Sequence, residues 1–201
     1  IAFSYDEEVG CTGVRPMIDE LGKSLPKPRM VLVGEPTSMR VVDAHKGGAR
    51  WRVDIKGRAV HSSVAPLGVN TITYAAKIIG ELHRMEEELK GKPNPRFDPP
   101  HGTLTITRLE AGTASNIVPA ECWFLWEIRA LPGQDVSGYE RRLNAFVQEK
   151  CLPEMRKVAP EADIKITKSQ MGIPAFEATP GSEVVALALK LAQQNETFAV
   201  S

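Results

Sequence analysis

The chain has 201 residues, of which 42% are hydrophobic and 25% are charged, a composition typical of folded globular domains and not of disordered segments. Its 25 Lys and Arg residues balance 25 Asp and Glu residues, so no excess of positive charge favours a nucleic acid or an anionic membrane as a partner. No apolar run reaches the roughly 18 residues that a membrane-spanning helix needs. We therefore expect neither nucleic-acid binding nor membrane insertion.

The three cysteines, Cys11, Cys122 and Cys151, are odd in number and far apart, and they form no CxxC pair. This distribution fits neither a disulfide framework nor a zinc finger. We expect three free thiols in a reducing compartment, which predicts a cytoplasmic protein.

Both ends of the chain carry the pattern of an α/β sheet with covered faces. Residues 1–5 and 30–33 are short apolar runs typical of buried strands, and residues 14–21 between them are compatible with a helix. Near the other end, a helical run over residues 182–194 precedes a strand-like segment at 197–201. Because residue 1 is Ile and already belongs to a predicted strand, we interpret the chain as a fragment.

The middle of the chain follows a different pattern. From Gly48 onward Trp51, Val53 and Ile55 alternate with charged residues, which is typical of a strand with one face in water. The further predicted elements are a helix at 69–90, strands at 103–109 and 121–128, a helix at 137–156 and a strand at 163–168.

This order is β-α-β-β-α-β, the ferredoxin-like split βαβ arrangement, in which helices cover one face of the sheet and leave the other open. We expect this unit, residues 47–172, to be inserted into an α/β domain formed by residues 1–46 and 173–201.

Carboxylates follow the first two predicted strands. Asp6, Glu7 and Glu8 come directly after the first strand, and Glu35 follows the second in the sequence Gly34-Glu35-Pro36-Thr37. Open α/β sheets bind ligands at the carboxyl ends of their strands. The pattern leaves two interpretations open, a solvated acidic turn and a site for zinc or a hard cation.

Three further polar residues stand in the inserted unit. His61 lies in a polar loop after the first strand, Asn116 ends the turn-like segment that begins at Gly112, and Arg129 follows an apolar strand. An exposed loop histidine and ordinary turn chemistry are the leading explanations for the first two. The guanidinium of Arg129 has the geometry to bind a carboxylate. Taken singly, none of these residues predicts a function.

Several motifs together carry a family resemblance. In chain order they are Ser4–Cys11, Gly34–Thr37, His45–Gly47, Gly57 with His61–Ser63, Gly68–Asn70 and Gly112–Pro119. In order and spacing they are similar to the dinuclear-zinc deacetylase and exopeptidase family over nearly the whole chain. The resemblance implies an α/β fold, in which a fragment of a zinc-exopeptidase-like catalytic domain carries an inserted ferredoxin-like α+β lid and dimerisation domain.

The resemblance also implies roles for the acidic residues. Glu7 matches the family's general base, while Glu8 and Glu35 match metal ligands of a site for two Zn²⁺ ions, with Co²⁺ as an alternative. The family's His-x-Asp pair, its bridging aspartate and its last histidine ligand have no counterpart in these 201 residues. We therefore expect this chain by itself to bind zinc poorly and to be inactive.

The resemblance also implies roles for three residues of the lid domain. His61 matches a histidine that reaches across a homodimer and stabilises the tetrahedral oxyanion, and Asn116 and Arg129 match residues that hold the substrate's carboxylate. The expected reaction is hydrolysis of the amide of a small N-acyl amino acid, with an acetyl group as the first expectation. N-succinyl-diaminopimelate or a dipeptide with a free carboxylate is the alternative substrate. A dimerisation or binding module without catalysis is the alternative from another class.

Overall fold

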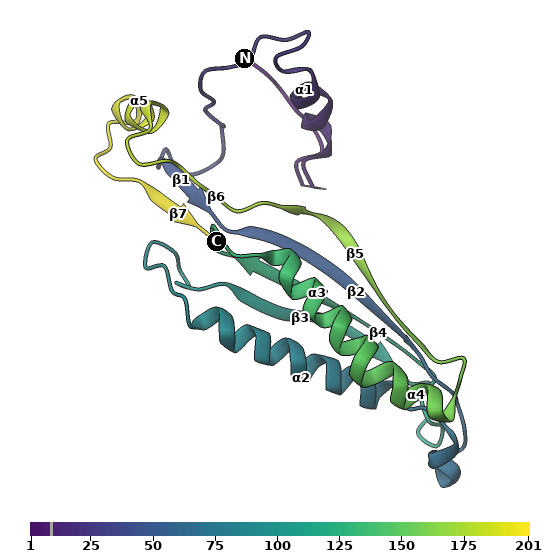
Figure 1. The fold of residues 1–201 in the computed structure, drawn as a ribbon. Helices are drawn as coiled ribbons and strands as arrows, with labels where there is room; N and C mark the ends of the chain where they lie inside the picture. The colour runs from purple at the N-terminus through teal and green to yellow at the C-terminus, as the bar shows by residue number, and fades with distance from the viewer. Residues whose placement is uncertain (9) are drawn as a thin grey trace. The chain divides into compact units, whose positions relative to one another are not determined.

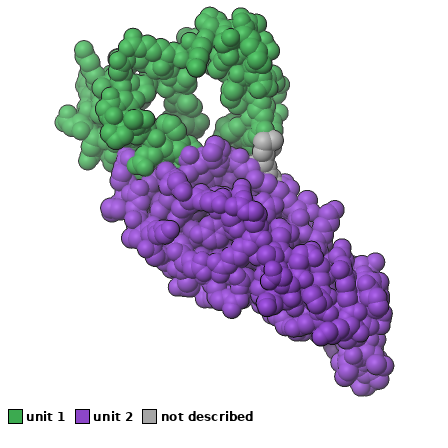
Figure 2. Space-filling view, viewed as in Figure 1, with its two compact units in different colours: residues 1–45, 176–200 green, residues 46–175, 201 purple. Residues whose placement is uncertain are grey.

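The computed structural model describes residues 1–8 and 10–201, with only the backbone at positions 170 and 171. The chain divides into two compact units, residues 1–45 with 176–200 and residues 46–175 with 201, which Figure 2 shows in different colours. Among the described residues, no helix combines the length and the apolar character needed to cross a bilayer.

The unit of residues 46–175 is built on one four-stranded sheet. Its strands are β2 (Gly47–Lys56), β3 (Thr103–Ala111), β4 (Glu121–Ala130) and β5 (Asp163–Ile173). They lie in the order β3-β4-β2-β5, and every neighbouring pair is antiparallel. The 3-10 helix η2 (Ser62–Leu67) and the helix α2 (Thr71–Lys90) join β2 to β3. The predicted β-α-β-β-α-β order is confirmed.

Helices α2 and α3 (Val136–Phe146) lie on one face of this sheet (Figure 1). The alternation predicted for β2 places Trp51, Val53 and Ile55 in the core beneath them, each at most 2% exposed. Trp51 stacks on Trp126 of β4, with ring centroids 4.2 Å apart and planes inclined by 10°. Charged residues of β2 alternate with these and therefore occupy the other face, which none of the described helices of this unit covers.

Local sequence explains where the helices begin and change. The side chain of Asn70 accepts a hydrogen bond from the backbone N–H of Ile72 and so caps α2. The single helix predicted at 137–156 is instead α3, a π-helical turn (Val147–Cys151) and α4 (Leu152–Val158). Pro153 in the first turn of α4 has no N–H to continue the helical ladder, which accounts for the change of helix type there.

The other unit contains a three-stranded sheet in the order β6-β1-β7. Strand β1 (Val42–His45) pairs antiparallel with β6 (Phe176–Glu177) and parallel with β7 (Phe198–Val200). The helix α5 (Glu183–Ala192) and strand β7 fall within the predicted ranges, whereas β1 and β6 were not predicted. A short 3-10 helix η1 (Thr12–Val14) and α1 (Arg15–Glu20) correspond to the helix expected at 14–21.

The two strands expected at residues 1–5 and 30–33 are not formed, and those predictions are wrong. Both segments are irregular, and their apolar side chains are exposed, to 92% at Phe3 and 74% at Val33. A strand requires a partner for its backbone hydrogen bonds, and no strand of the described chain pairs with either segment. The apolar pattern indicates burial, but burial depends on elements that pack against the segment.

Candidate functional site

His61 and Asn116 lie together at one end of the four-stranded sheet. Strand β2 ends at Lys56, which pairs with Glu121, the first residue of β4. The loop after β2 and the loop before β4 therefore emerge side by side. His61 forms an isolated antiparallel bridge with Ile117, and the backbone N–H of Ser62 donates to the carbonyl oxygen of Asn116 at 2.8 Å. Both His61 and Asn116 are exposed.

The local backbone fixes the orientation of the His61 ring. His61 caps η2: its Nδ1 atom accepts a hydrogen bond from the backbone N–H of Ser63 at 3.2 Å and lies 2.8 Å from Ser63 Oγ. Because Nδ1 is an acceptor, the proton of the neutral ring resides on Nε2. The exposed edge of the imidazole therefore presents a hydrogen-bond donor.

A cavity of about 620 Å³ lies at the same end of the unit. Its walls come from η2 and the start of α2 on one side and from residues 112–119 on the other, including Ser62, Asn70 and Ser115. Ordinary turn chemistry was one explanation for the segment that begins at Gly112. In the structure this segment lines the cavity, and the lining also includes residues next to His61 and Asn116 in the sequence.

Arg129 lies at the opposite end of the same sheet. It is the ninth residue of β4 and pairs with Gly48 of β2 and Thr103 of β3. At about 3.3 Å per residue, the backbone from Glu121 to Arg129 extends on the order of 26 Å. The structure therefore brings His61 and Asn116 together and does not bring Arg129 to them. Its Nε atom donates to Oε1 of Glu127 at 2.9 Å.

The predicted acidic residues lie in exposed, irregular parts of the other unit. Glu7 and Glu8 occupy a turn, and the carbonyl oxygen of Glu7 accepts hydrogen bonds from Gly10 and Cys11 at 3.0 and 3.1 Å. Glu35 precedes a bend in which its carbonyl oxygen accepts from Thr37 at 2.7 Å.

Their carboxylates are suitable donors for zinc, but a tetrahedral site needs four ligands. Within the described residues, neither Glu8 nor Glu35 belongs to a group of three candidate ligands. These residues can therefore supply only part of a zinc site.

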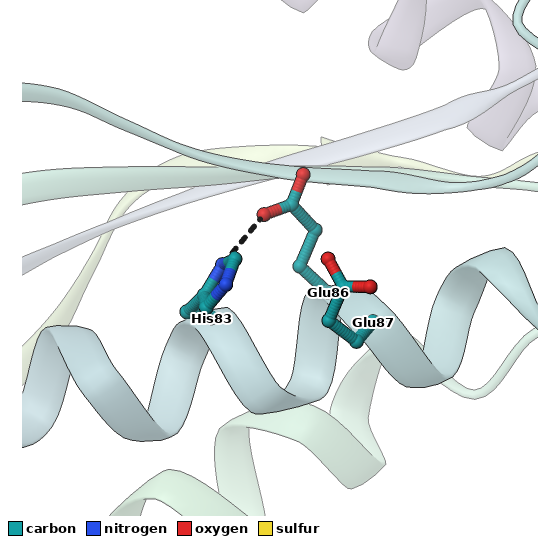
Figure 3. Close-up of side chains that lie close together, drawn as sticks. All are labelled: His83, Glu86 and Glu87. Atoms are coloured by element: carbon teal, nitrogen blue, oxygen red, sulfur yellow. Dashed lines mark hydrogen bonds and ion pairs between the residues drawn. The ribbon is translucent and has the colours of Figure 1, made fainter.

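The described residues do contain one such group elsewhere, His83, Glu86 and Glu87 of α2 (Figure 3). They lie at i, i+3 and i+4 on one side of the helix, and their ligand atoms are within 4.8 Å of one another. The ammonium of Lys90 is 2.6 Å from Glu87 and 4.0 Å from Glu86, and its hydrogen bond lowers the pKa of Glu87. Such ion pairs are typical of a solvated, charge-paired helix face.

Residues 43–155 match the family profile of the M20 peptidase dimerisation domain. The chain belongs to this family. An acetylornithine deacetylase from Myxococcus xanthus is 30% identical over 174 residues, 86% of this chain and 44% of the relative. An acetylornithine deacetylase from Buchnera aphidicola subsp. Acyrthosiphon pisum is 29% identical over 196 residues, 97% of this chain and 49% of the relative. The chain thus spans about half the length of the curated relatives it matches.

Solved structures agree with the M20 assignment. Aminopeptidase PepT from Bacillus cereus is 26% identical with a TM-score of 0.58, over 80% of this chain and 39% of that chain. A tripeptidase from Staphylococcus aureus, 19% identical with a TM-score of 0.54 over 81% of this chain and 40% of that chain, shows the same fold. The family resemblance and the α/β fold class expected from the sequence are confirmed.

Proposed function

We propose that these residues belong to a cytoplasmic, metal-dependent amidohydrolase that converts N2-acetyl-L-ornithine into L-ornithine and acetate, a step of arginine biosynthesis. The observation that carries the proposal is the similarity to acetylornithine deacetylases, which extends over 97% of this chain in one relative. The three free cysteines support a reducing compartment.

Glu7 accepts a proton from the attacking water and delivers it to the leaving amine, the work of a general acid and base. Glu8 and Glu35 each contribute a carboxylate to a site for two Zn²⁺ ions, or Co²⁺ in their place. The remaining ligands are expected from outside the 201 residues. When bound, the metal would polarise the amide carbonyl and lower the pKa of a water molecule.

The residues of the four-stranded unit act on the substrate. The Nε2–H of His61 donates a hydrogen bond to the oxyanion that develops on the amide carbonyl. Asn116 and Arg129 bind the carboxylate of the amino acid, Arg129 through two parallel N–H donors.

One copy of the chain cannot supply all of these groups to one small substrate, since on the order of 26 Å of β4 backbone separates Arg129 from Glu121, the end of the strand at which His61 and Asn116 lie. We therefore propose a homodimer in which each site takes its arginine from one subunit and its histidine from the other. Membership of a family named for its dimerisation domain supports this arrangement.

The test is complementation between two inactive variants of the whole, metal-loaded protein. His61→Ala and Arg129→Ala are each expected to hydrolyse N2-acetyl-L-ornithine very slowly. After subunit exchange in an equimolar mixture, half of the dimers are mixed and one site in each is intact, so about a quarter of the wild-type activity returns. Each variant exchanged with itself is the control. A mixture that stays inactive would exclude the shared site.

A second candidate activity is the hydrolysis of short peptides, which the 26% identity to aminopeptidase PepT favours. Comparing kcat/KM for N2-acetyl-L-ornithine, N-succinyl-diaminopimelate and a dipeptide with a free carboxylate decides between the substrates. Glu7→Gln distinguishes all of these enzymes from a dimerisation or binding module: an enzyme loses several orders of magnitude in rate with its fold intact, whereas a module is unchanged.

A further inference from the structure

Three charged side chains form a row on the open face of the four-stranded sheet. Glu127 and Arg129 are two residues apart on β4 and so project on the same side. Arg50 of β2 pairs directly with Glu127 in the strand register. Oε1 of Glu127 accepts from Arg129 Nε at 2.9 Å, and Oε2 accepts from Arg50 Nε at 3.1 Å and also from Arg50 Nη2.

The hydrogen bond from Arg129 Nε to Glu127 leaves the two terminal amino groups of Arg129 available to a ligand. The guanidinium is held through Nε, and neither of its terminal amino groups donates to another residue of the described chain. These two groups form the fork that matches the two oxygens of a carboxylate. The side chain of Arg129 is 46% exposed, whereas that of Glu127 is only 19% exposed. The carboxylate that holds Arg129 is therefore largely covered, whereas about half of the Arg129 side chain is accessible.

Arg50 preserves the positive charge that a carboxylate ligand requires. Glu127 with Arg129 alone would be a neutral pair, whereas Arg50, Glu127 and Arg129 together carry one net positive charge. Burial by itself would raise the pKa of Glu127, but hydrogen bonds and charge from the two guanidiniums outweigh it and lower the pKa. Glu127 thus stays ionised at neutral pH and continues to hold both arginines.

Gly48 provides the space in which Arg129 lies. It pairs with Arg129 in the register between β2 and β4. A Cβ atom at position 48 would be 2.9 Å from Nη1 of Arg129 and 3.3 Å from Cζ. The clash would involve the flexible end of one side chain and no backbone atom. A side chain here would therefore displace the guanidinium and leave the sheet intact.

We propose that Glu127, Arg50 and Gly48 are positioning residues that hold Arg129 with its terminal amino groups toward the substrate's carboxylate, an inference that rests on the proposed function. Glu127 fixes the guanidinium through Nε, Arg50 balances the charge of Glu127, and Gly48 leaves room for the group. None of the three contacts the substrate itself.

The chain offers a matched control on the neighbouring strand. Arg108 and Glu110 of β3 also form an ion pair two residues apart. The guanidinium of Arg108 lies over Trp123, 4.8 Å from the ring centroid, and has no assigned substrate role. Glu110→Gln therefore removes a more exposed ion pair of the same spacing without touching Arg129.

The experiment compares Glu127→Gln, Gly48→Ala and Glu110→Gln in the whole protein on N2-acetyl-L-ornithine and on its carboxamide, which has no carboxylate for Arg129 to bind. Glu127→Gln and Gly48→Ala are expected to raise KM for the carboxylate substrate about tenfold, with kcat within about twofold, the pattern of lost uniform binding. Their kcat/KM for the carboxamide should equal that of the wild type. Glu110→Gln should change neither substrate.

Equal losses on the carboxylate and the carboxamide, or a Glu127→Gln variant that behaves like Glu110→Gln, would overturn the positioning role. The wild-type protein is measured first. If it hydrolyses no N-acyl amino acid, the proposed function itself fails and this inference falls with it. If the wild type is active, the comparison of the variants tests only the positioning role.

Discussion

Nδ1 of His61 accepts a hydrogen bond from the backbone N–H of Ser63, two residues further along the chain. A backbone donor cannot reverse its role, so this contact fixes the tautomer of the neutral ring without the help of another subunit. The donor Nε2–H is thus prepared before any substrate binds, which is the preorganisation that oxyanion stabilisation requires.

Replacing His61 by Ala should lower kcat of the whole protein by a factor on the order of 10² to 10³, the usual loss for one oxyanion donor. The thermal unfolding midpoint should fall only slightly, because the side chain is exposed and its loss removes a single capping hydrogen bond of η2. His83→Ala, at another exposed histidine, is the control and should retain full activity. A His61→Ala variant with wild-type kcat would remove His61 from the reaction.

The stacked tryptophans of the core should respond unequally to two substitutions. The indole Nε1 atoms of Trp51 and Trp126 are buried and have no hydrogen-bond partner among the described residues. Trp126→Phe keeps an aromatic ring against Trp51 and removes one unsatisfied donor, so we expect a cost below about 1.5 kcal/mol. Trp126→Ala should cost about 3–5 kcal/mol. Urea unfolding measures both, and equal costs would contradict this account of the core.

Glu127 should make the chain sensitive to acid. Its pKa is lowered in the folded state, so its stabilising contribution is complete above the ordinary glutamate pKa and is lost as the pH falls through the lowered value. Wild type should exceed Glu127→Gln by about 1–2 kcal/mol in unfolding free energy at pH 7. This difference should shrink as the pH falls below the ordinary glutamate pKa and through the lowered pKa of the folded state. A difference that is constant with pH would show that the charge of Glu127 does not contribute.

The three thiols should differ in reactivity. Burial raises the pKa of Cys151 to about 11 and also raises that of Cys122, so both are protonated and covered at pH 8. Cys11 is partly exposed. A thiol reagent should therefore modify Cys11 rapidly in the native chain and the other two only after unfolding. Mass spectrometry of the modified peptides identifies the sites, and rapid labelling of Cys151 would contradict the assigned burial.

The four-stranded unit was predictable from sequence because each of its signals is local. The alternation in β2 and the helical spacing in α2 describe faces that are buried within residues 46–175 themselves. The segments at 1–5 and 30–33 have equally apolar sequences, but their burial requires strands that the described chain does not place beside them. Local pattern cannot distinguish these two situations.

Trp123 shows how strand alternation predicts the face that a residue occupies. It lies on the open face, with the guanidinium of Arg52 4.1 Å from its ring centroid and that of Arg108 on the neighbouring strand. Its position between the buried Cys122 and Phe124 already placed it on the opposite face of β4.

The candidate site was predictable residue by residue but not as an arrangement. Motif spacing selected His61, Asn116 and Arg129, and antiparallel pairing of β2 with β4 explains why the first two meet and the third does not. The row that includes Arg50 and Glu127 was missed, because it depends on strand register. Only the register places residue 50 opposite residue 127, and no short motif contains both.

The chain enters and leaves residues 46–175 through paired strands, and this pairing affects how domains can be inserted or removed. His45 pairs with Phe176 in one unit, and Gly48 pairs with Ile173 in the other. The chain therefore enters and leaves residues 46–175 at adjacent points, the geometry in which a domain can be inserted into a host or removed from it. Recombination at these two points would exchange residues 46–175 as one unit. Deleting it needs only a short turn to rejoin the chain between β1 and β6.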